Sequence, residues 1–589
     1  MKGIKKLSAC LPFLITVSGV LAQDLDRVMP ESLPQQLNTE NDMSSASGTI
    51  SALQQLSAAR EGETVVLPEL KGIRVIGHED ELLNGFDTPG VTAGIPILKG
   101  EYEQQLSDVF IDQPASMESL NRIVDTLRFT LASLGRPFSL VFLPEQDITS
   151  GVVQIVVQQS TLSSIRVENN EYFSEKNYLQ RLPLVTNGTI DADQLNTGLE
   201  RINQNPFRQA KVTVRQGNQP ATTAVVVNAQ EIRPLQFFTG FSNYGTPNTG
   251  TERYSAGVNW GNVLGLGHRM TLQWSADLKS QLSRAISGNY QMDLPNADQL
   301  TVFGAYSDIA SDLPFPLQQE GKSYQLGMEV NHALNDRGDN YSHSIRFGAD
   351  YKYSDNNLDY VLPPFVFAVT NTETEIMQAR VAYQATLSDS RGYTQADIGL
   401  TASPGGLLAK NSDEAFTNTR FNASADYTYL TLDLRRETRL QQAPDGWRWL
   451  VNSGGQLSNR NLLGSEQYSA GGNATVRGYE EGEVLGDNAF YFNQELVLPM
   501  LSLLDPGRLQ PGSTDALTLF AFQDYAHTWN QDKLPDEKAF EIASVGIGFR
   551  YQYQPYLSAS FSYGWQLKDS GSSNEGDNRR MHFSLRLTL

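Results

Sequence analysis

The chain has 589 residues, of which 40% are hydrophobic and 19% charged, and its formal net charge at pH 7 is −21. This acidic balance argues against a nucleic-acid partner, because a protein that binds nucleic acid needs a basic face for the phosphates. Cys10 is the only cysteine and the six histidines lack metal-ligand spacing, so we expect no disulfide framework, no metal site and no cofactor.

The N-terminus has the pattern of an export signal. Three lysines within residues 1–6 precede an apolar run at 7–21, which is shorter than the ~20 residues of a membrane-spanning helix. Small residues ending at Ala22 offer a cleavage site, and we predict a signal peptide at 1–22. A lipoprotein signal at Cys10 is rejected, because almost no apolar segment precedes that cysteine.

Residues 23–67 are polar, with two prolines near their start and a serine-rich patch in their middle. A helical pattern at 50–59 carries only a thin apolar stripe. We therefore predict that 23–67 form an N-terminal linker, with a candidate plug helix inside it.

Residues 68–232 are predicted to form two small α/β domains, at 68–160 and 161–232, with the same order of elements. Gly135 should end the second helix of the first domain, and Asp191 can cap the second helix of the other. The repeated order of elements supports the assignment of two domains of one type better than either domain would alone. The order is strand, helix, helix, strand, strand, at 73–75, 102–110, 120–134, 139–143 and 152–157, and again at 164–167, 174–182, 191–203, 210–215 and 223–228.

Residues 233–589 show a different pattern, in which apolar residues alternate with polar or small ones. The run at 545–553 places Ile547 and Phe549 on one face and Arg550 on the other. A period of two is that of a β-strand with two different faces, and such runs match the ~9–11 residues that a tilted strand needs to cross a bilayer.

A soluble β-sandwich or propeller would also show one apolar face on each strand. Tyrosine-rich strand ends, charges on the opposite face and the export signal favour a membrane barrel instead. We therefore predict that 233–589 form a transmembrane antiparallel β-barrel of about 16 strands, at ~22 residues per strand and connection.

Motifs near the end of each α/β domain resemble those of a known family. Pro144, Gln146 and Gly151, just before the last strand of the first domain, are similar to a signature of the two-partner secretion transporters (TpsB type, ShlB/FhaC/HecB-like). Asn205 and Pro206 resemble the matching stretch of the second domain. In that family these periplasmic modules are called POTRA domains, and the family belongs to the same outer-membrane superfamily as the BamA barrel-assembly factor.

The barrel region carries the most diagnostic part of the resemblance. Val476, Arg477, Gly478 and Tyr479 resemble the tip of a long loop that folds back into the barrel lumen in this family. Phe522 and Asp524 resemble the barrel-wall motif that receives the arginine, and the stretches 241–245 and 262–267 look like the first barrel hairpin. The resemblance therefore implies an ion pair between Arg477 and Asp524. Without it, Arg477 would be read as a solvated arginine on a surface loop.

Three positions depart from the family pattern. Ala489 and Ala526 stand where glycines are expected, and the chain ends in Leu589 where outer-membrane barrels commonly end in an aromatic residue. The two prolines after the signal peptide also interrupt the region in which the family's plug helix is expected.

No nucleotide loop or catalytic triad is visible, and the glycine-rich stretches fall in predicted hairpin turns, so we expect no enzyme activity. The resemblance implies a pore in the outer membrane of a Gram-negative cell, with its N-terminal part in the periplasm. It would recognise and secrete a partner exoprotein of the adhesin or haemolysin type, without ATP. The implied partners are an exoprotein with an N-terminal secretion domain, outer-membrane lipid and periplasmic chaperones.

Two other functions are open to such a chain. An outer-membrane protein assembly or insertion factor is the main alternative, but such factors usually carry more than two POTRA domains. A passive porin would not need the periplasmic module at all.

Overall fold

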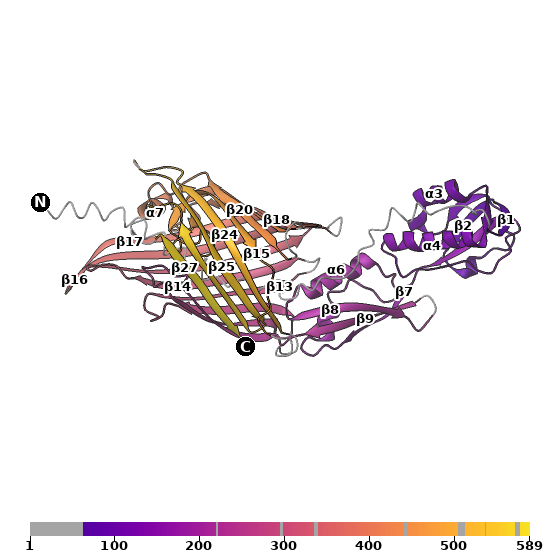
Figure 1. Cartoon of the computed structure of the whole chain (residues 1–589), viewed down its shortest axis with the longest axis horizontal. Helices are drawn as coiled ribbons and strands as arrows, with labels where there is room; N and C mark the ends of the chain where they lie inside the picture. The colour runs from indigo at the N-terminus through magenta and orange to yellow at the C-terminus, as the bar shows by residue number, and fades with distance from the viewer. Residues whose placement is uncertain are drawn as a thin grey trace. The chain divides into compact units, whose positions relative to one another are not determined.

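The computed structural model describes residues 63–589 except 220–221, 295–297, 335–339, 441–445, 505–512, 536 and 572–577 (Figure 1). The predicted signal peptide at 1–22 and the candidate plug helix lie outside these residues. The described residues divide into two compact units, one formed by 63–233 with 264–267 and the other by the rest of 234–589. Within the described part of the chain, every helix is too short or too polar to be a membrane span.

The first α/β domain is built on a four-stranded sheet with the order β3-β2-β6-β5. Helix α4 packs its apolar stripe, including Leu120, Ile123 and Leu127, into the core beneath this sheet. Its N-terminus is capped by Ser116, whose hydroxyl accepts a hydrogen bond from the Ser119 N–H at 3.0 Å. Gly135 follows the helix with φ +77°, a left-handed conformation that suits glycine. The elements are β1 (Val65–Leu70), β2 (Gly72–Ile76), β3 (Gly90–Ala93), α3 (Glu101–Phe110), β4 (Gln113–Ser116), α4 (Met117–Ser133), β5 (Leu140–Phe142) and β6 (Val152–Gln158), with short 3-10 turns η1 (Glu79–Glu81) and η2 (Pro96–Leu98).

The second α/β domain has a three-stranded sheet with the order β7-β9-β8. Asp191 caps α6, as its position predicts, by accepting hydrogen bonds from the backbone N–H groups of Asp193 and Gln194 at 2.9 and 3.2 Å. Strand β8 pairs with β9 on one side only, so its other side forms a sheet edge. The elements are β7 (Thr161–Glu168), α5 (Glu175–Leu179), α6 (Ala192–Asn203), β8 (Arg208–Gln216) and β9 (Thr222–Glu231).

Each helix and strand expected in 68–232 has a counterpart in these domains. Strands β1, β3 and β4 are additional, and β1 begins at Val65, inside the segment expected to be linker. β3 and β4 have four residues each, and such short strands show too few alternations for a period of two to be recognised.

Among the described residues, sixteen antiparallel strands close into a barrel, which confirms the predicted fold class (Figure 1). The first strand pairs with the last, with Phe241 opposite Leu585, so the sheet has no free side at the level of the barrel wall. The strands are β10 (Leu235–Ser242), β11 (Arg253–Val263), β12 (His268–Ala276), β13 (Ser283–Asp293), β14 (Gln299–Ser311), β15 (Leu317–Ala333), β16 (Tyr341–Leu362), β17 (Phe365–Asp389), β18 (Gly392–Pro404), β19 (Asp426–Arg439), β20 (Arg448–Ser458), β23 (Asn488–Val497), β24 (Thr514–Trp529), β25 (Phe540–Gln554), β26 (Leu557–Gln566) and β27 (Arg579–Thr588).

The alternation seen in the sequence is the alternation between the outside and the lumen of this barrel. On β25, Ile547 and Phe549 are 56% and 37% exposed on the outer face, whereas Arg550 forms an ion pair with Glu495 inside. Large apolar residues therefore face the membrane, and polar residues face the lumen.

Two long connections leave the barrel from the same end, because consecutive strands run in opposite directions. The connection 405–425 follows β18 and contains helix α7 (Asp413–Thr419), and the connection 459–487 follows β20. The latter contains the short strands β21 (Tyr468–Ala470) and β22 (Val484–Gly486), which pair with each other. We call this end of the barrel the loop end, and the connection 459–487 the lumen loop.

Candidate functional site

The tip of the lumen loop lies inside the barrel, against the inner faces of its last strands. Val476 and Tyr479 are fully buried and Arg477 is 6% exposed. Val476 and Tyr479 pack in one apolar cluster with Ala526 of β24 and Ile542 of β25. The methyl group of Ala526, where the family has glycine, is therefore accommodated against the tip of the loop.

Strand β24 presents the residues that receive Arg477. Its period of two places Phe522, Asp524 and Ala526 on the same inward face, and all three are buried. The Arg477 guanidinium donates from Nε to Oδ2 and from Nη2 to Oδ1 of Asp524, both at 2.8 Å, and the Arg477 backbone N–H adds a third bond at 3.0 Å. Its Cζ lies 3.7 Å from the centroid of the Phe522 ring. This two-point geometry fixes the orientation of the guanidinium, and the carboxylate also compensates its charge.

Two further charged residues complete this site, and no motif in the sequence points to either of them. The Nη1 group of Arg477 also donates to Glu495 of β23, which in turn accepts two bonds of 2.8 Å from Arg550 of β25. We call Arg477, Glu495, Asp524 and Arg550 the tip cluster. Its two cations and two anions balance, which is what a largely buried site requires.

The backbone of the tip also fits closely against β26 and β27. Gly478 has φ +95°, and a Cβ built on Gly564 would lie 2.7 Å from the Gly478 Cα, so both positions need glycine. The Gly478 N–H donates to Nε2 of the buried His582 at 3.2 Å, and the side chain of Gln566 donates to the Gly478 carbonyl at 2.7 Å. No sequence motif singles out His582 from the other five histidines.

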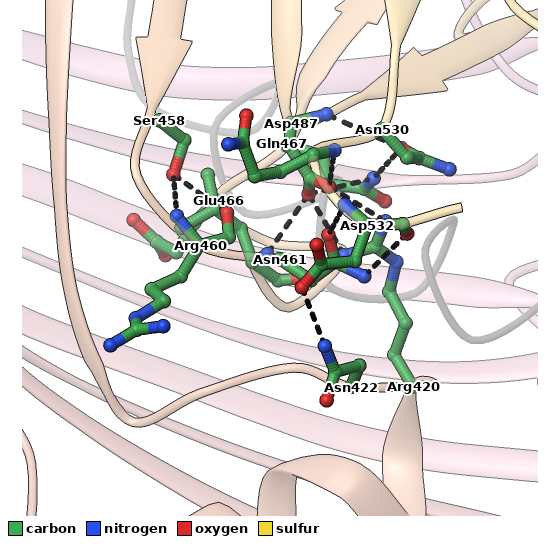
Figure 2. A network of polar contacts seen from close by, with 12 residues as sticks. Arg420, Asn422, Ser458, Arg460, Asn461, Glu466, Gln467, Asp487, Asn530 and Asp532 are labelled. Atoms are coloured by element: carbon green, nitrogen blue, oxygen red, sulfur yellow. Dashed lines mark hydrogen bonds and ion pairs between the residues drawn. The ribbon is translucent and has the colours of Figure 1, made fainter.

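The base of the lumen loop is held by a second buried ion pair. Arg420, just after α7, donates from its two terminal nitrogens to the two carboxylate oxygens of Asp487 at 2.8 and 3.1 Å. The Asp487 side chain is fully buried, and it also accepts bonds from Leu462 N–H and from the Gln467 side chain. Figure 2 shows Asp487 at the centre of these contacts.

Three connections of the loop end meet in this network. Asn461 of the lumen loop donates to the Phe421 carbonyl at 3.1 Å and to the Asp532 carbonyl at 2.9 Å, and Asn530 accepts a bond from Gln467 at 3.1 Å (Figure 2). The network therefore ties the 405–425 connection, both ends of the lumen loop and the connection after β24. We call Arg420, Asn461, Gln467, Asp487 and Asn530 the base network.

We expect Arg420→Ala to loosen the base of the lumen loop. The change leaves a fully buried Asp487 without its ion-pair partner, a loss of ~3–5 kcal/mol at such sites. The folded barrel should unfold in SDS at a lower temperature, as followed by its heat-dependent shift on a gel. Arg436→Ala is the matched control, because the Arg436–Asp389 pair has side chains 29% and 45% exposed and such pairs contribute ~0–1 kcal/mol. Equal shifts in the two variants would contradict a structural role for the base network.

A polar cavity lies beside the lumen loop. It is lined by wall residues that include Arg253, Lys352 and Arg586 and by loop residues that include Glu466 and Glu481. The lumen is thus only partly filled by the loop, and the remaining space is bordered by charged and polar side chains.

The motif residues of the α/β domains lie in turns of their own domains. The Gln146 side chain donates to the Gln154 carbonyl at 2.6 Å and accepts from the Gln154 N–H at 2.7 Å, so it pairs with β6 as a strand would. Pro144 is buried beside it, and Gly151 has φ +83° at the start of β6. Asn205 is buried and accepts a bond from the Phe207 N–H at 3.1 Å, next to a half-buried Pro206. These side chains shape the backbone of their turns.

Comparisons with known proteins agree on one family. The family profile described as haemolysin secretion/activation protein ShlB/FhaC/HecB matches residues 221–551. The outer membrane transporter CdiB of Dickeya dadantii (strain 3937) is 22% identical over 526 residues, which cover 87% of this chain and 88% of that protein. The heme/hemopexin transporter protein HuxB of Haemophilus influenzae (strain 86-028NP) is 22% identical over 414 residues, covering 67% and 68%. The solved structure of CdiB from Escherichia coli has the same fold, with a TM-score of 0.71 at 17% identity over 92% of this chain and 95% of that one.

Proposed function

This chain belongs to the haemolysin secretion/activation protein family ShlB/FhaC/HecB, the outer-membrane transporters of two-partner secretion, and from that premise we propose that it exports one exoprotein of the adhesin or haemolysin type without ATP. The barrel lies in the outer membrane, and the part before it lies in the periplasm. We take 68–160 and 161–232 as its two POTRA domains. The loop end of the barrel then faces the cell exterior.

The tip cluster is the observation that most directly supports a pore whose opening depends on the position of the lumen loop. The lumen loop occupies part of the barrel interior, and its position sets how much of the lumen is open. Arg477 holds the tip to Asp524 and Glu495 by charge-assisted hydrogen bonds in a site with little access to water. Because two discrete points hold the loop, at its tip and at its base, the passage beside it keeps a defined shape.

Transport without a nucleotide needs another source of free energy. An unfolded exoprotein that reaches the exterior and folds there can no longer return through the barrel. Folding thus removes the unfolded chain from the equilibrium and draws more of it outward, by the same mass action that links ligand binding to stability. The partner's own folding free energy then drives export.

Recognition is assigned to the periplasmic domains. Strand β8 has nine residues, and the edge-facing backbone groups of one of them, Ala210, are bound by the Asn203 side chain, whereas β5, which also lies at a sheet edge, has only three residues. An extended N-terminal segment of the exoprotein can add to such an edge through backbone hydrogen bonds, with side-chain pockets giving selectivity. The longer β8 edge is therefore the better candidate.

The function is tested with the purified protein in liposomes of outer-membrane lipid. We expect an unfolded candidate exoprotein, encoded beside this chain, to become protected from external protease when no nucleotide is present. Liposomes without the protein are the control. If the exoprotein stays accessible while the protein speeds the insertion of other β-barrels into the same liposomes, the protein is an assembly factor and the export proposal fails.

A further inference from the structure

Two neighbouring strands of the barrel are much longer than a membrane crossing requires. β16 has 22 residues and β17 has 25, whereas β23 has 10 and a tilted strand crosses a bilayer with ~9–11. Figure 1 shows β16 and β17 reaching beyond most of the other barrel strands at the end that carries α7, and β15 accompanies β16 as far as Tyr360. Their outer halves, joined at residues 363–364, therefore form a hairpin outside the membrane at the loop end.

The end of this hairpin is apolar, although it is not part of the lipid-facing wall. Phe365, Val366 and Phe367 are 63%, 62% and 55% exposed. A polar stretch at 370–375 (Thr-Asn-Thr-Glu-Thr-Glu), opposite Ser-Asp-Asn-Asn on β16, separates them from the membrane-facing residues of β17 that begin at Met377. At ~3.4 Å per residue, Phe365 stands about 40 Å along the strand from Met377. The apolar end is thus presented outside the bilayer.

One side of β17 is open along this apolar segment. β18 pairs with β17 only from Ala379 inward, and farther out the Glu375 N–H donates to the Lys410 carbonyl at 3.2 Å. Within the described part of the chain, residues 365–371 pair with β16 on one side and with nothing on the other. These seven residues, which we call the open edge, contain no charge and no proline. Charges and prolines are two of the usual protections of a free strand edge, and the open edge lacks both; its one protective feature is a β-bulge at Val369. An edge with so little protection indicates a surface made for pairing.

We propose that the open edge pairs with the exported exoprotein as it leaves the barrel and adds it to β17 as a further strand. The inference rests on the proposed function and assigns it a binding surface outside the cell. An emerging chain is extended and has unpaired backbone N–H and C=O groups, which are the groups that a strand edge binds. The chemistry fits a β-prone segment with few charges, because exposed phenylalanine and valine side chains flank the edge.

The position of the open edge favours this occupant over others. Just inside it, Ile376 of β17 packs in one apolar cluster with Phe416 of α7 and with Leu462 of the lumen loop. The edge thus begins beside the base of the loop that borders the passage, where an exported chain must emerge. A strand held there is kept from sliding back, and it offers the next segment of exoprotein a new edge on which to fold.

The pairing is tested by photo-crosslinking in cells that hold an exoprotein arrested during export. A benzophenone amino acid is placed at Phe367 on the open edge or, as a control, at Phe315, which is 74% exposed in the connection between β14 and β15. We expect a crosslink to the exoprotein from Phe367 and only background from Phe315. Equal crosslinks at the two positions, crosslinks between two copies of this chain, or none at Phe367 would each overturn the proposal.

A second experiment measures what the edge does. Replacing 359–369 with Asn-Gly joins Leu358 to Thr370, which already face each other, through a favoured two-residue turn. We expect export to continue while the exoprotein becomes protease-resistant at the surface several-fold more slowly. Val366→Lys with Val369→Lys keeps the hairpin, places charges on the edge and should have the same effect. Folding at the normal rate in both variants would overturn the proposal, whereas failure of the unaltered protein to export would instead refute the proposed function.

Discussion

Arg477→Ala and Asp524→Ala should each abolish most export while the barrel still reaches the outer membrane. Either change leaves a buried charge without its two-point partner, which costs ~3–5 kcal/mol in such a site. At ~1.4 kcal/mol per factor of ten, the ratio of molecules with the loop tip bound at the barrel wall to those with the tip released should fall by ~10²-fold or more. The measurement is the amount of exoprotein in the medium, divided by the amount of heat-modifiable barrel in the membrane.

The structure ranks the partners of Arg477. Asp524 accepts three bonds from this residue, whereas Glu495 accepts one and keeps Arg550 as a partner when Arg477 is lost. Glu495→Gln should therefore reduce export less than Asp524→Asn. The charge swap Arg477→Asp with Asp524→Arg should fail to restore export, because Arg477→Asp would place a second carboxylate beside Glu495.

The control for these variants is a pair of the same chemistry outside the tip cluster. Arg284 and Asp308 form a 2.7 Å ion pair with side chains 57% and 32% exposed, and Arg284→Ala should leave export unchanged. Normal export by both Arg477→Ala and Asp524→Ala would mean that the loop tip does not depend on this pair.

The barrel could be predicted from sequence because each of its strands repeats the same simple condition, an apolar face toward lipid and a polar face toward the lumen. The α/β domains could be predicted because their helices carry caps and apolar stripes, as at Asp191 and Leu120. Both signals lie within one element, so they need no knowledge of the partner elements.

The contacts that the sequence could not predict are those set by pairing between distant elements. Glu495 alternates like any other lumen residue, and only the closed barrel brings it beside Arg477 and Arg550. Arg420 and Asp487 are 67 residues apart in the chain, and the packing of two connections joins them. The open edge of β17 was missed for another reason, since a strand keeps its period of two whether or not a neighbour covers its side.

Removing the POTRA domains, 68–232, should abolish export of the exoprotein without preventing the barrel from assembling. The barrel closes through the pairing of its own first and last strands, so we expect it to fold without the periplasmic sheets. Recognition should be lost, because the β8 edge is removed with these domains. Export at the normal rate from this variant would show that the barrel alone selects its cargo.

A single proline can test the β8 edge without removing the domain. Ala210 donates its N–H to the Asn203 side chain at 2.7 Å, and its carbonyl accepts from the same side chain at 3.3 Å, so its backbone groups point away from β9. Because backbone groups alternate along an antiparallel strand, the N–H of Val214 also points to the open side, whereas that of Thr213 points to β9. Val214→Pro therefore removes one donor from the edge and leaves the pairing with β9 intact.

We expect Val214→Pro to weaken binding of the exoprotein's N-terminal segment by about tenfold, since one lost hydrogen bond of ~0.5–1.5 kcal/mol adds to the steric cost of the ring at the interface. Val214→Ala, which shortens the side chain and keeps the donor, is the matched control and should bind nearly normally. The measurement is the Kd of the segment for the full-length protein in detergent. The β7 edge makes a useful comparison, because residues 187–189 already cover its start through bonds with Leu162. A proline in β7 at Ile165 that weakened binding as much as Val214→Pro would place the recognition surface elsewhere in the domain.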